Sequence, residues 1–510
     1  MSFGPLVWLS VYYSFSILLH ITVVAAASDF ATVYLVDPHG KSVGVRELFD
    51  KYVSRMSDMD MLKPNWAGLI KCFGHSGHRV VIETLEISKM QIVHSGTADC
   101  PVSSKEICDF VHLAVPDKMG YHRHSCISDS SAPKLVPTAA SITPTGSYKL
   151  STMLQGGANN NCPLHYPPND PLFHQQAALY EALRVERAWS LTDNCRLPRR
   201  DVVIGVLDTG ILEDYPDLIG KVLDGYDASG VPISSLHDNY GHGTAMTSIV
   251  GSIIGNDFGT AGIVDKVKFR PIRLTSDEHG RASTSQFMRG LEGALLGFDD
   301  IDILLIAYAD KFTYDEQDAL SDILRSREDI LVITSGMSAD STTRHPTQLY
   351  LPCRLHRYFN NVICAIATET DQPDVLVYNS TLDATLGVPS TDVMAPFIVD
   401  GEWDLIPVTG SSASAAITAG VAALMMSFDV LTPTDVKNIL VTTTDKKART
   451  KDERETDVGV IRPDLAVQRA IARATPRTSR TSYKMLRTRD NRKQKHFSPI
   501  APGRNPLRKK

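Results

Sequence analysis

Three short segments of the chain contain residue types that could together perform nucleophilic catalysis. Asp208 ends the stretch DVVIGVLD, His242 lies within DNYGHGTAM, and Ser412 lies within VTGSSASAAITAG. A serine hydroxyl becomes a strong nucleophile when a histidine accepts its proton, and a carboxylate orients that histidine and stabilises its protonated form. Each segment alone also fits a structural role, because Asp and Gly are common in turns and small residues suit a packed helix.

The DTG at residues 208–210 also raises the possibility of an aspartic protease. Those enzymes need two carboxylates that share a proton, usually supplied by two such segments. The nearest second segment is VTG at residues 408–410, which has no aspartate. The chain cannot build the dyad from these segments, so the serine mechanism is favoured.

The stretches around these residues predict an α/β domain. Residues 201–207 form a continuous apolar run bounded by turn residues, as expected for a buried parallel strand. Further strand candidates are 266–274, 301–309, 330–334 and 361–368. Helical stretches lie between and after them, and capping-box patterns predict that two begin at Ser283 and Thr432. Such sheets place functional residues at the carboxyl ends of their strands.

Together these motifs resemble those of subtilisin-like serine proteases, the subtilases. Residues 202–218 resemble the family's aspartate motif, 238–251 its histidine motif and 408–426 its serine motif, in the chain order Asp, His, Ser. Residues 168–179 resemble the segment that opens many of its catalytic domains. The resemblance covers about residues 165–475 and implies a three-layer α/β fold, with helices on both faces of a mostly parallel sheet.

The resemblance also assigns a role to each candidate residue. It implies that Asp208 orients the histidine, that His242 is the general base and then the general acid, and that Ser412 is the nucleophile. The backbone N–H of Ser412 then supplies one half of an oxyanion hole. The implied function is a serine endopeptidase that cuts protein or peptide substrates through an acyl-enzyme, with no cofactor required for the chemistry.

Two departures from the family pattern leave a second hypothesis open. Met337 stands where the family supplies an asparagine to the oxyanion hole, and a thioether cannot donate a hydrogen bond. Loss of one such donor typically reduces turnover by about 10²–10³. In the substrate strand, Tyr308 and Ala309 could narrow the cleft. A catalytically impaired homologue that binds proteins or peptides is therefore the alternative, although the complete triad favours the enzyme.

The N-terminus and the cysteines predict entry into the secretory pathway. Residues 3–27 are apolar and end in three alanines, which favours a cleaved signal peptide (1–27) over an uncleaved membrane anchor. The eight cysteines show no metal-binding spacing, so disulfides are expected, with connectivity open. The sequon at 379–381 could carry a glycan. We expect a secreted or luminal protein, membrane-attached only if the first segment stays uncleaved.

The remaining segments predict accessory parts. Residues 28–150 read as a small α+β module followed by a linker, and by the resemblance they are a pro-region that inhibits the enzyme. Residues 476–510 are basic and poor in apolar residues, which is typical of a solvated, disordered tail rather than a nucleic-acid binding segment. A structural calcium ion is possible near Asp217 and residues 255–259, although the sequence does not define the metal ligands.

Overall fold

A computed structural model describes most of the region from residue 167 to residue 474 and several elements before it. The main described ranges are 167–192, 198–230, 236–312, 314–336, 349–378, 384–428 and 431–474, and between residues 29 and 149 they are the elements named below with a few single residues. The segments 1–27 and 476–510, Met337, and the sequon at 379–381 lie outside the described residues. The predictions made for them stay predictions.

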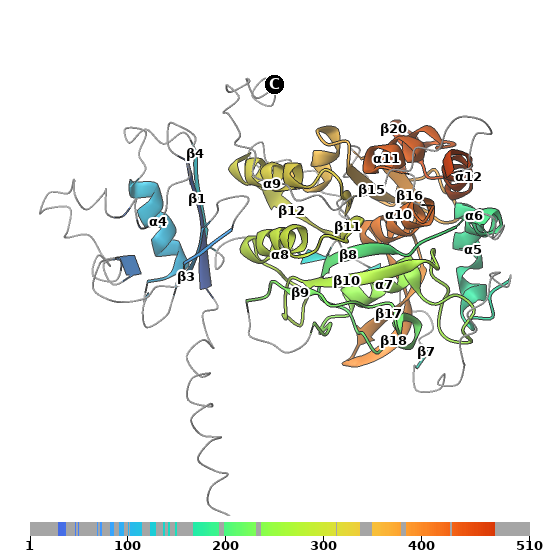
Figure 1. Ribbon diagram of the computed structural model, residues 1–510, viewed down its shortest axis with the longest axis horizontal. Coiled ribbons are helices and arrows are strands. Elements are labelled where there is room, and N and C mark those ends of the chain that lie inside the picture. The colour runs from blue at the N-terminus through green and yellow to red at the C-terminus, as the bar shows by residue number, and fades with distance from the viewer. Residues whose placement is uncertain are drawn as a thin grey trace, which may run out of the picture. The chain divides into compact units, whose positions relative to one another are not determined.

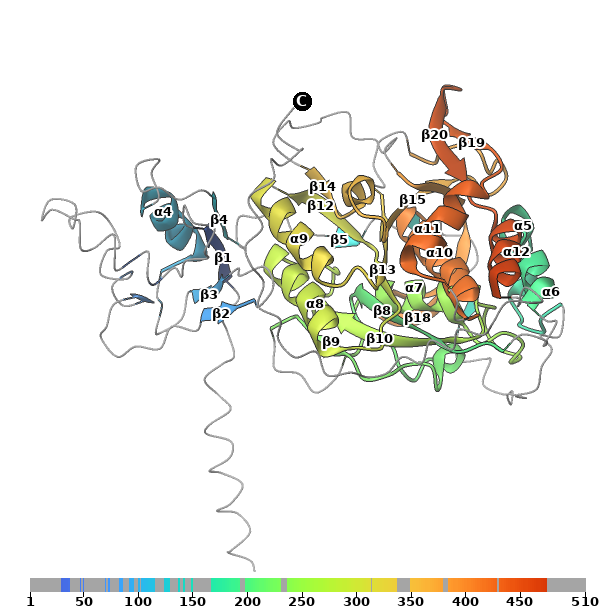
Figure 2. The same ribbon diagram turned by 45° about the horizontal axis from the view of Figure 1, so that its top comes forward.

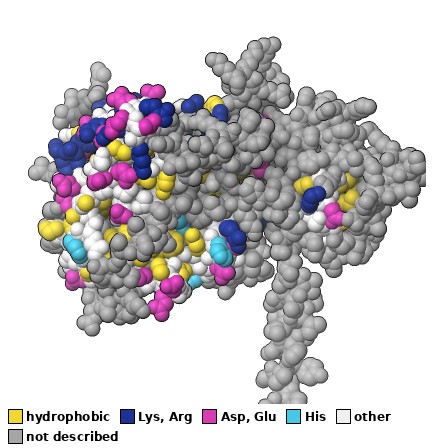
Figure 3. All heavy atoms as spheres, turned by 180° about the vertical axis from the view of Figure 1, so that it is seen from behind, with side chains coloured by type: hydrophobic (Ala, Val, Ile, Leu, Met, Phe, Trp, Pro, Cys, Tyr) yellow, Lys and Arg dark blue, Asp and Glu magenta, His cyan; other side chains and the backbone are white. Residues whose placement is uncertain are grey.

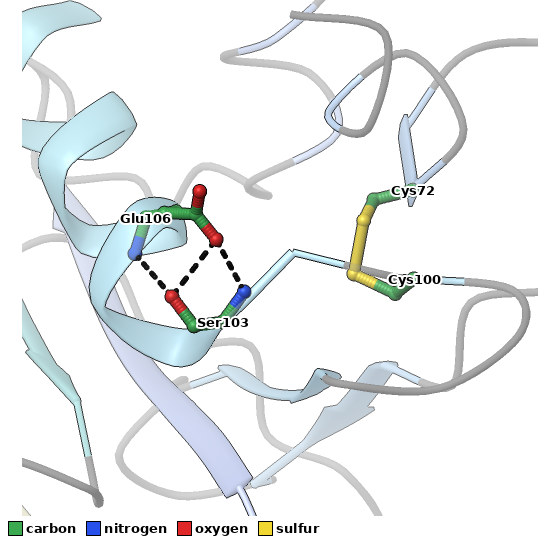
Figure 4. The surroundings of a disulfide bond; sticks show 4 residues. All are labelled: Cys72, Cys100, Ser103 and Glu106. Carbon is green, nitrogen blue, oxygen red and sulfur yellow. Dashed lines mark hydrogen bonds between the residues drawn. A yellow bond between two sulfur atoms is a disulfide. The ribbon is translucent and has the colours of Figure 1, made fainter. Parts of the chain in front are cut away.

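The N-terminal elements form the expected α+β unit. Its sheet has the order β2-β3-β1-β4, and β1 runs antiparallel to both β3 and β4. The strands are β1 (Asp29–Val36), β2 (Ile82–Thr84), β3 (Gln91–Ser95) and β4 (Arg123–Ser128), and the helix is α4 (Ser104–Ala114). In Figure 4 the residue before α4, Ser103, donates its N–H to Glu106 Oε2 at 2.7 Å and accepts the Glu106 N–H at 3.3 Å. This capping box explains why the helix begins there.

The described cysteines are all in disulfide bonds, as the sequence predicts. Cys72 is bonded to Cys100, next to the start of α4 (Figure 4), and Cys353 is bonded to Cys364. Cys108 is also disulfide-bonded, and no described cysteine is free. Cys353–Cys364 ties a short 3₁₀ helix, η4 (Cys353–Arg357), to one of the central strands of the larger sheet.

The larger unit is built on a nine-stranded sheet of order β19-β20-β16-β15-β13-β11-β8-β10-β9 (Figure 1). Its strands are β8 (Val202–Asp208), β9 (Tyr226–Asp227), β10 (Val267–Arg273), β11 (Ile303–Ile306), β13 (Leu331–Ser335), β15 (Val362–Thr368), β16 (Leu386–Pro389), β19 (Lys447–Arg449) and β20 (Glu455–Val460). Neighbouring strands from β20 to β9 are parallel, and β19 is antiparallel to β20. The predicted mostly parallel sheet is confirmed.

Helices cover both faces of this sheet, as Figures 1 and 2 show, so the domain has three layers. Alternate residues of β11 divide between two buried cores: Ile303 and Leu305 belong to one, Leu304 and Ile306 to the other. The first core includes α5 (Phe173–Leu183), α6 (Val185–Thr192), α7 (His242–Gly251), α10 (Ser411–Met426), α11 (Pro433–Thr442) and α12 (Pro463–Ala474); the second includes α8 (Thr284–Gly297) and α9 (Tyr314–Ser326). Burial on both faces explains why the strands are apolar without alternation.

Local sequence signals place the helix starts correctly. Ser283 caps α8 and Thr432 caps α11, each in a complete capping box with Gln286 or Asp435. At the edge near β19 and β20, acidic and basic side chains are interspersed (Figure 3, upper left). In β19, the partly exposed Arg449 pairs with Asp374 at 3.0 Å. This mixture is typical of a solvated surface.

One predicted strand is wrong in its extent. Residues 301–309 were expected as a single strand, but the chain leaves the parallel sheet at Ala307, where β11 ends and β12 (Tyr308–Phe312) begins. Strand β12 pairs antiparallel with β14 (Leu349–Leu351) instead. An apolar run reports burial but not the partner, so it cannot show where a strand changes sheets.

Short strands from the segment that precedes the larger unit add to two of its edges. Strand β5 (Val136–Pro137) pairs antiparallel with Tyr308 and Ala309 of β12. Strands β6 (Ser141–Ile142) and β7 (Tyr148–Lys149) pair antiparallel with β18 (Glu402–Thr409), which forms a hairpin with β17 (Val393–Val399) and leads directly into α10.

Candidate active site

The first two members of the predicted triad meet in the structure. Asp208 is the last residue of β8, at its carboxyl end, and His242 is the first residue of α7. Both side chains are almost completely buried, and His242 Nδ1 lies 2.8 Å from Asp208 Oδ1. Asp208 Oδ1 also accepts the backbone N–H of Thr209 at 2.8 Å. This contact is the one that an orienting carboxylate would make with the imidazole ring.

Two glycines make the approach of the helix to the strand end possible. A Cβ on Gly243 would lie 2.1 Å from the Gly210 carbonyl oxygen and 3.1 Å from Asp208 Cβ. Gly210 itself has φ +117°, and a Cβ there would lie 2.5 Å from the Leu236 carbonyl oxygen. Any side chain at Gly243 must push α7 away from the turn after β8, and His242 moves with the helix.

Ser412 is the second residue of α10 and is fully buried. Its Oγ donates to the Ala307 carbonyl oxygen at 3.4 Å. The next residue, Tyr308, places its ring edge-on to the His242 ring, with 6.3 Å between ring centroids. Ser412 and His242 thus contact consecutive residues at the junction between β11 and β12, the serine at Ala307 and the histidine at Tyr308. The positive end of the α10 helix dipole also lies at Ser412, where it favours a developing negative charge.

The other ring nitrogen of the histidine is available for proton transfer. His242 Nε2 is buried and has no hydrogen-bond partner among the described residues. Because Nδ1 faces the carboxylate, Nε2 is the nitrogen that can accept a proton. The serine hydroxyl points to Ala307 rather than to Nε2, and catalytic hydrogen bonds are often long or unmade in the absence of substrate.

Tyr308, which the sequence identifies as a departure, is fully buried. Its Oη donates to the Gly280 carbonyl oxygen at 2.7 Å, so it joins β12 to the loop before α8. Ala309, the next residue, is also buried. Their backbones form the edge on which β5 lies.

Sequence reasoning missed Asp238, a fully buried carboxylate three residues before the N-cap of α7. It accepts hydrogen bonds from backbone and hydroxyl groups on both sides of the Asp208–His242 pair. An acidic residue just ahead of a glycine-flanked helix start was the available signal, because anionic side chains favour helix N-termini.

A second polar cluster surrounds the segment where calcium was considered possible. Asp217 accepts the Asn256 side-chain N–H at 2.9 Å and the Thr260 N–H at 3.1 Å, and Asp170 accepts the Gly255 N–H at 2.8 Å. Burial raises the pKa of Asp217 to about 8 and also raises the pKa of Asp170. Among the described residues, no three Asp, Glu, His or Cys side chains gather as a metal site.

Comparison with known proteins agrees with this geometry. A model of the subtilase family matches residues 199–459, about half of the chain, and this range includes all three predicted triad residues. The chain belongs to the subtilase family. It is therefore a subtilisin-like serine peptidase, a hydrolase that acts on proteins or peptides, and its mostly parallel α/β fold is the one expected of this family.

Individual relatives are distant. Thermitase from Thermoactinomyces vulgaris is 24% identical over 270 residues, covering 51% of this chain and 86% of thermitase. Halolysin from Haloferax mediterranei is 25% identical over 283 residues, and the match spans 54% of this chain and 50% of halolysin. The crystal structure of fervidolysin from Fervidobacterium pennivorans, a keratinolytic enzyme related to subtilisin, has a TM-score of 0.57 at 16% identity, covering 86% of this chain and 60% of that one.

Gly243→Ala tests whether the close approach of α7 to the β8 turn matters for the site. We expect lower stability and loss of most activity, because the added Cβ collides with the Gly210 carbonyl. Peptide hydrolysis and the melting temperature measure the two effects. Gly297→Ala is the matched control, since it lies in helix α8 with nothing within 4 Å of its added Cβ. It should keep full activity; equal losses in both variants would contradict the prediction.

Proposed function

We propose that this subtilase is a serine endopeptidase whose nucleophile is Ser412, with His242 as general base and Asp208 as the orienting carboxylate. The observation that carries the proposal is the buried 2.8 Å contact between His242 Nδ1 and Asp208 Oδ1, which leaves Nε2 as the proton acceptor. Ser412 lies on the adjacent helix start, next to the junction at Ala307.

The chemistry proceeds in two halves. In the first, Ser412 Oγ forms a bond to the scissile carbonyl carbon while His242 Nε2 takes the hydroxyl proton. The carbonyl oxygen becomes an oxyanion at the positive end of α10. The C–N bond then breaks as Nε2 returns the proton to the leaving amine, which gives the acyl-enzyme. In the second half, water forms a bond to the acyl carbon as it loses a proton to His242 Nε2. The bond between that carbon and Ser412 Oγ then breaks, Nε2 returns the proton to Oγ, and the acid is released.

Labelling with a fluorophosphonate probe tests this assignment and the impaired-homologue alternative together. We expect covalent labelling of the purified, processed protein at Ser412 and none in Ser412→Ala. Ser414→Ala is the control, because Ser414 is in the same helix but its Oγ bonds Ser390 Oγ at 2.7 Å instead. A folded wild-type protein without label would favour the impaired homologue, in which Met337 replaces an oxyanion donor.

We also propose that residues 28–150 are a pro-region that inhibits the enzyme. The support is the pairing of β5 with the β12 edge at Tyr308 and Ala309, and of β6 with Val408 and Thr409, just before α10. The segment thus pairs both with the residues that follow Ala307, which Ser412 contacts, and with the strand that leads into α10. Extended peptides bind proteases by the same main-chain pairing, so the pro-region and a substrate compete for these edges.

Expression of the full chain tests the pro-region. Wild-type protein should lose its N-terminal unit through a cut in the linker after β7, near residue 150. Ser412→Ala should retain the unit, and N-terminal sequencing distinguishes the two. Processing of the Ser412→Ala protein at the same bond in a protease-free preparation would show that its own serine does not make the cut.

Calcium is a further proposal, as a structural ion rather than a catalytic one. Asp170, Asp217 and the amide oxygen of Asn256 fit the ion by chemistry, because calcium prefers carboxylate, amide and carbonyl oxygens. In the structure Asn256 offers its N–H to Asp217, so ion binding requires this amide to turn. With only two carboxylates present, backbone carbonyls would supply the remaining ligands.

Removal of calcium should lower the melting temperature of the wild-type protein, and added calcium should restore it. Ligand at about 100 times its Kd stabilises the folded state by about 2.7 kcal/mol. Asp217→Asn should weaken this response, whereas Asp214→Asn, an exposed carboxylate on the same loop, should keep it. A melting temperature that changes neither with chelator nor with added calcium would contradict the proposal.

We propose that the protein is made in the secretory pathway. The described disulfides Cys72–Cys100 and Cys353–Cys364 support this, because such bonds persist in oxidising compartments. No helix among the described residues is both long and apolar enough to cross a membrane. The apolar segment 3–27, with its signal-like end, lies outside that part of the chain.

A further inference from the structure

Asp238 is a buried carboxylate between the two elements that carry the catalytic pair. Its Oδ1 accepts the Thr209 hydroxyl at 2.7 Å and the Gly241 N–H at 2.7 Å, and its Oδ2 accepts both the N–H and the hydroxyl of Thr244 at 2.8 Å. The Tyr240 N–H also reaches Oδ1, at 3.1 Å. All of these partners are donors, which is the environment that an ionised carboxylate requires.

Helix α7 depends on this carboxylate because the side chain of its own N-cap residue cannot accept a hydrogen bond from the helix. The N-cap residue is Gly241, which has no side chain to accept a helix N–H. The second and third N–H groups of the helix instead donate to Thr209 Oγ1 at 2.9 Å, from Gly243, and to Asp238 Oδ2, from Thr244. A negative charge at the N-terminus of the helix also interacts favourably with the helix dipole. Asp238 therefore fixes the first turn of α7, where His242 lies.

The same carboxylate also fixes the turn after β8. Thr209 donates a hydrogen bond from its hydroxyl to Asp238 Oδ1 and another from its backbone N–H to Asp208 Oδ1. Thr244, in the first turn of α7, accepts the Leu212 N–H through its hydroxyl at 3.0 Å and so joins the helix to the chain beyond the turn. One buried carboxylate thus joins Thr209, the residue after Asp208, to Gly241 and Thr244, which flank His242 at the start of α7.

We propose that Asp238 is a positioning residue for the Asp208–His242 pair, and that it sets the rate of proton transfer without touching the substrate. This inference rests on the proposed function of Ser412, His242 and Asp208. Replacing the carboxylate by an amide keeps the shape but turns an N–H group toward N–H and O–H donors. The strand end and the helix then separate or rotate, and misplacement by about 1 Å can reduce a catalytic rate about 10²-fold.

Asp238→Asn is the central variant, and Asp464→Asn is its matched control. Asp464 is as buried as Asp238 and lies in the first turn of another helix, α12, where it pairs with Arg462 at 3.0 Å. Both variants should lose stability. Only Asp238→Asn should lower kcat, by about 10²-fold, with KM changed by less than about twofold.

A second measurement does not depend on turnover. The proton that His242 Nδ1 shares with Asp208 should give a low-field NMR resonance in the full chain, which is assigned by its loss in His242→Ala. We expect Asp238→Asn to shift or broaden this resonance and Asp464→Asn to leave it unchanged. If the wild-type protein has neither turnover nor probe labelling, the proposed function fails, while the resonance still decides the role of Asp238.

Thr209 provides a route if Asp238→Asn does not fold. Thr209→Val removes the hydroxyl that joins Asp238 to the turn and should reproduce the loss of kcat, whereas Thr209→Ser keeps the hydroxyl and should restore it. The proposal would be overturned if Asp238→Asn had a normal kcat and an unchanged histidine resonance. If Asp238→Asn does not fold, the same result in Thr209→Val would overturn it. Asp238 would then only stabilise the fold.

Discussion

The buried contact between His242 and Asp208 is the constraint on which the rest of the site depends. A carboxylate removed from water loses several kcal/mol of solvation, which only good hydrogen bonds and a fixed partner offset. Asp208 Oδ1 meets His242 and the Thr209 N–H, while Oδ2 has no partner among the described residues. The surroundings must therefore hold the pair together, and two glycines, a capped helix start and a parallel strand end do so.

The parallel sheet explains why three distant parts of the chain converge. Asp208 ends the strand β8, Ala307 follows the end of the neighbouring strand β11, and Ser412 contacts Ala307 from the start of α10. Carboxyl ends of parallel strands lie at one edge, so residues placed just after them become neighbours. The order of the strands in the sheet brings these groups together, because residues within a few positions of the carboxyl ends of adjacent strands lie close to one another.

The sequence predicts the elements that follow local rules and fails where tertiary pairing decides. Capping boxes locate α8 and α11 because Ser283 and Thr432 act within one turn of their own helices. The apolar run through β11 does not reveal that the chain turns at Ala307, since β12 finds its partner β14 about forty residues later. The pairing of β5 with β12 is similarly invisible, because two residues of extended chain carry no periodic pattern.

Asp238 shows the same division at the site. The proposed triad residues can be selected from the sequence because the chemistry proposed for them requires particular side chains in a particular order, whereas a buried acceptor is defined only by the donors that surround it. Its donors come from Thr209, far upstream, and from the turn and helix that follow it. A motif with His between glycines therefore requires more than the histidine that is proposed to be catalytic. A glycine side chain cannot accept the helix N–H groups, so another group must do so, and only the folded chain shows that this group also accepts the hydroxyl of Thr209, the residue after Asp208.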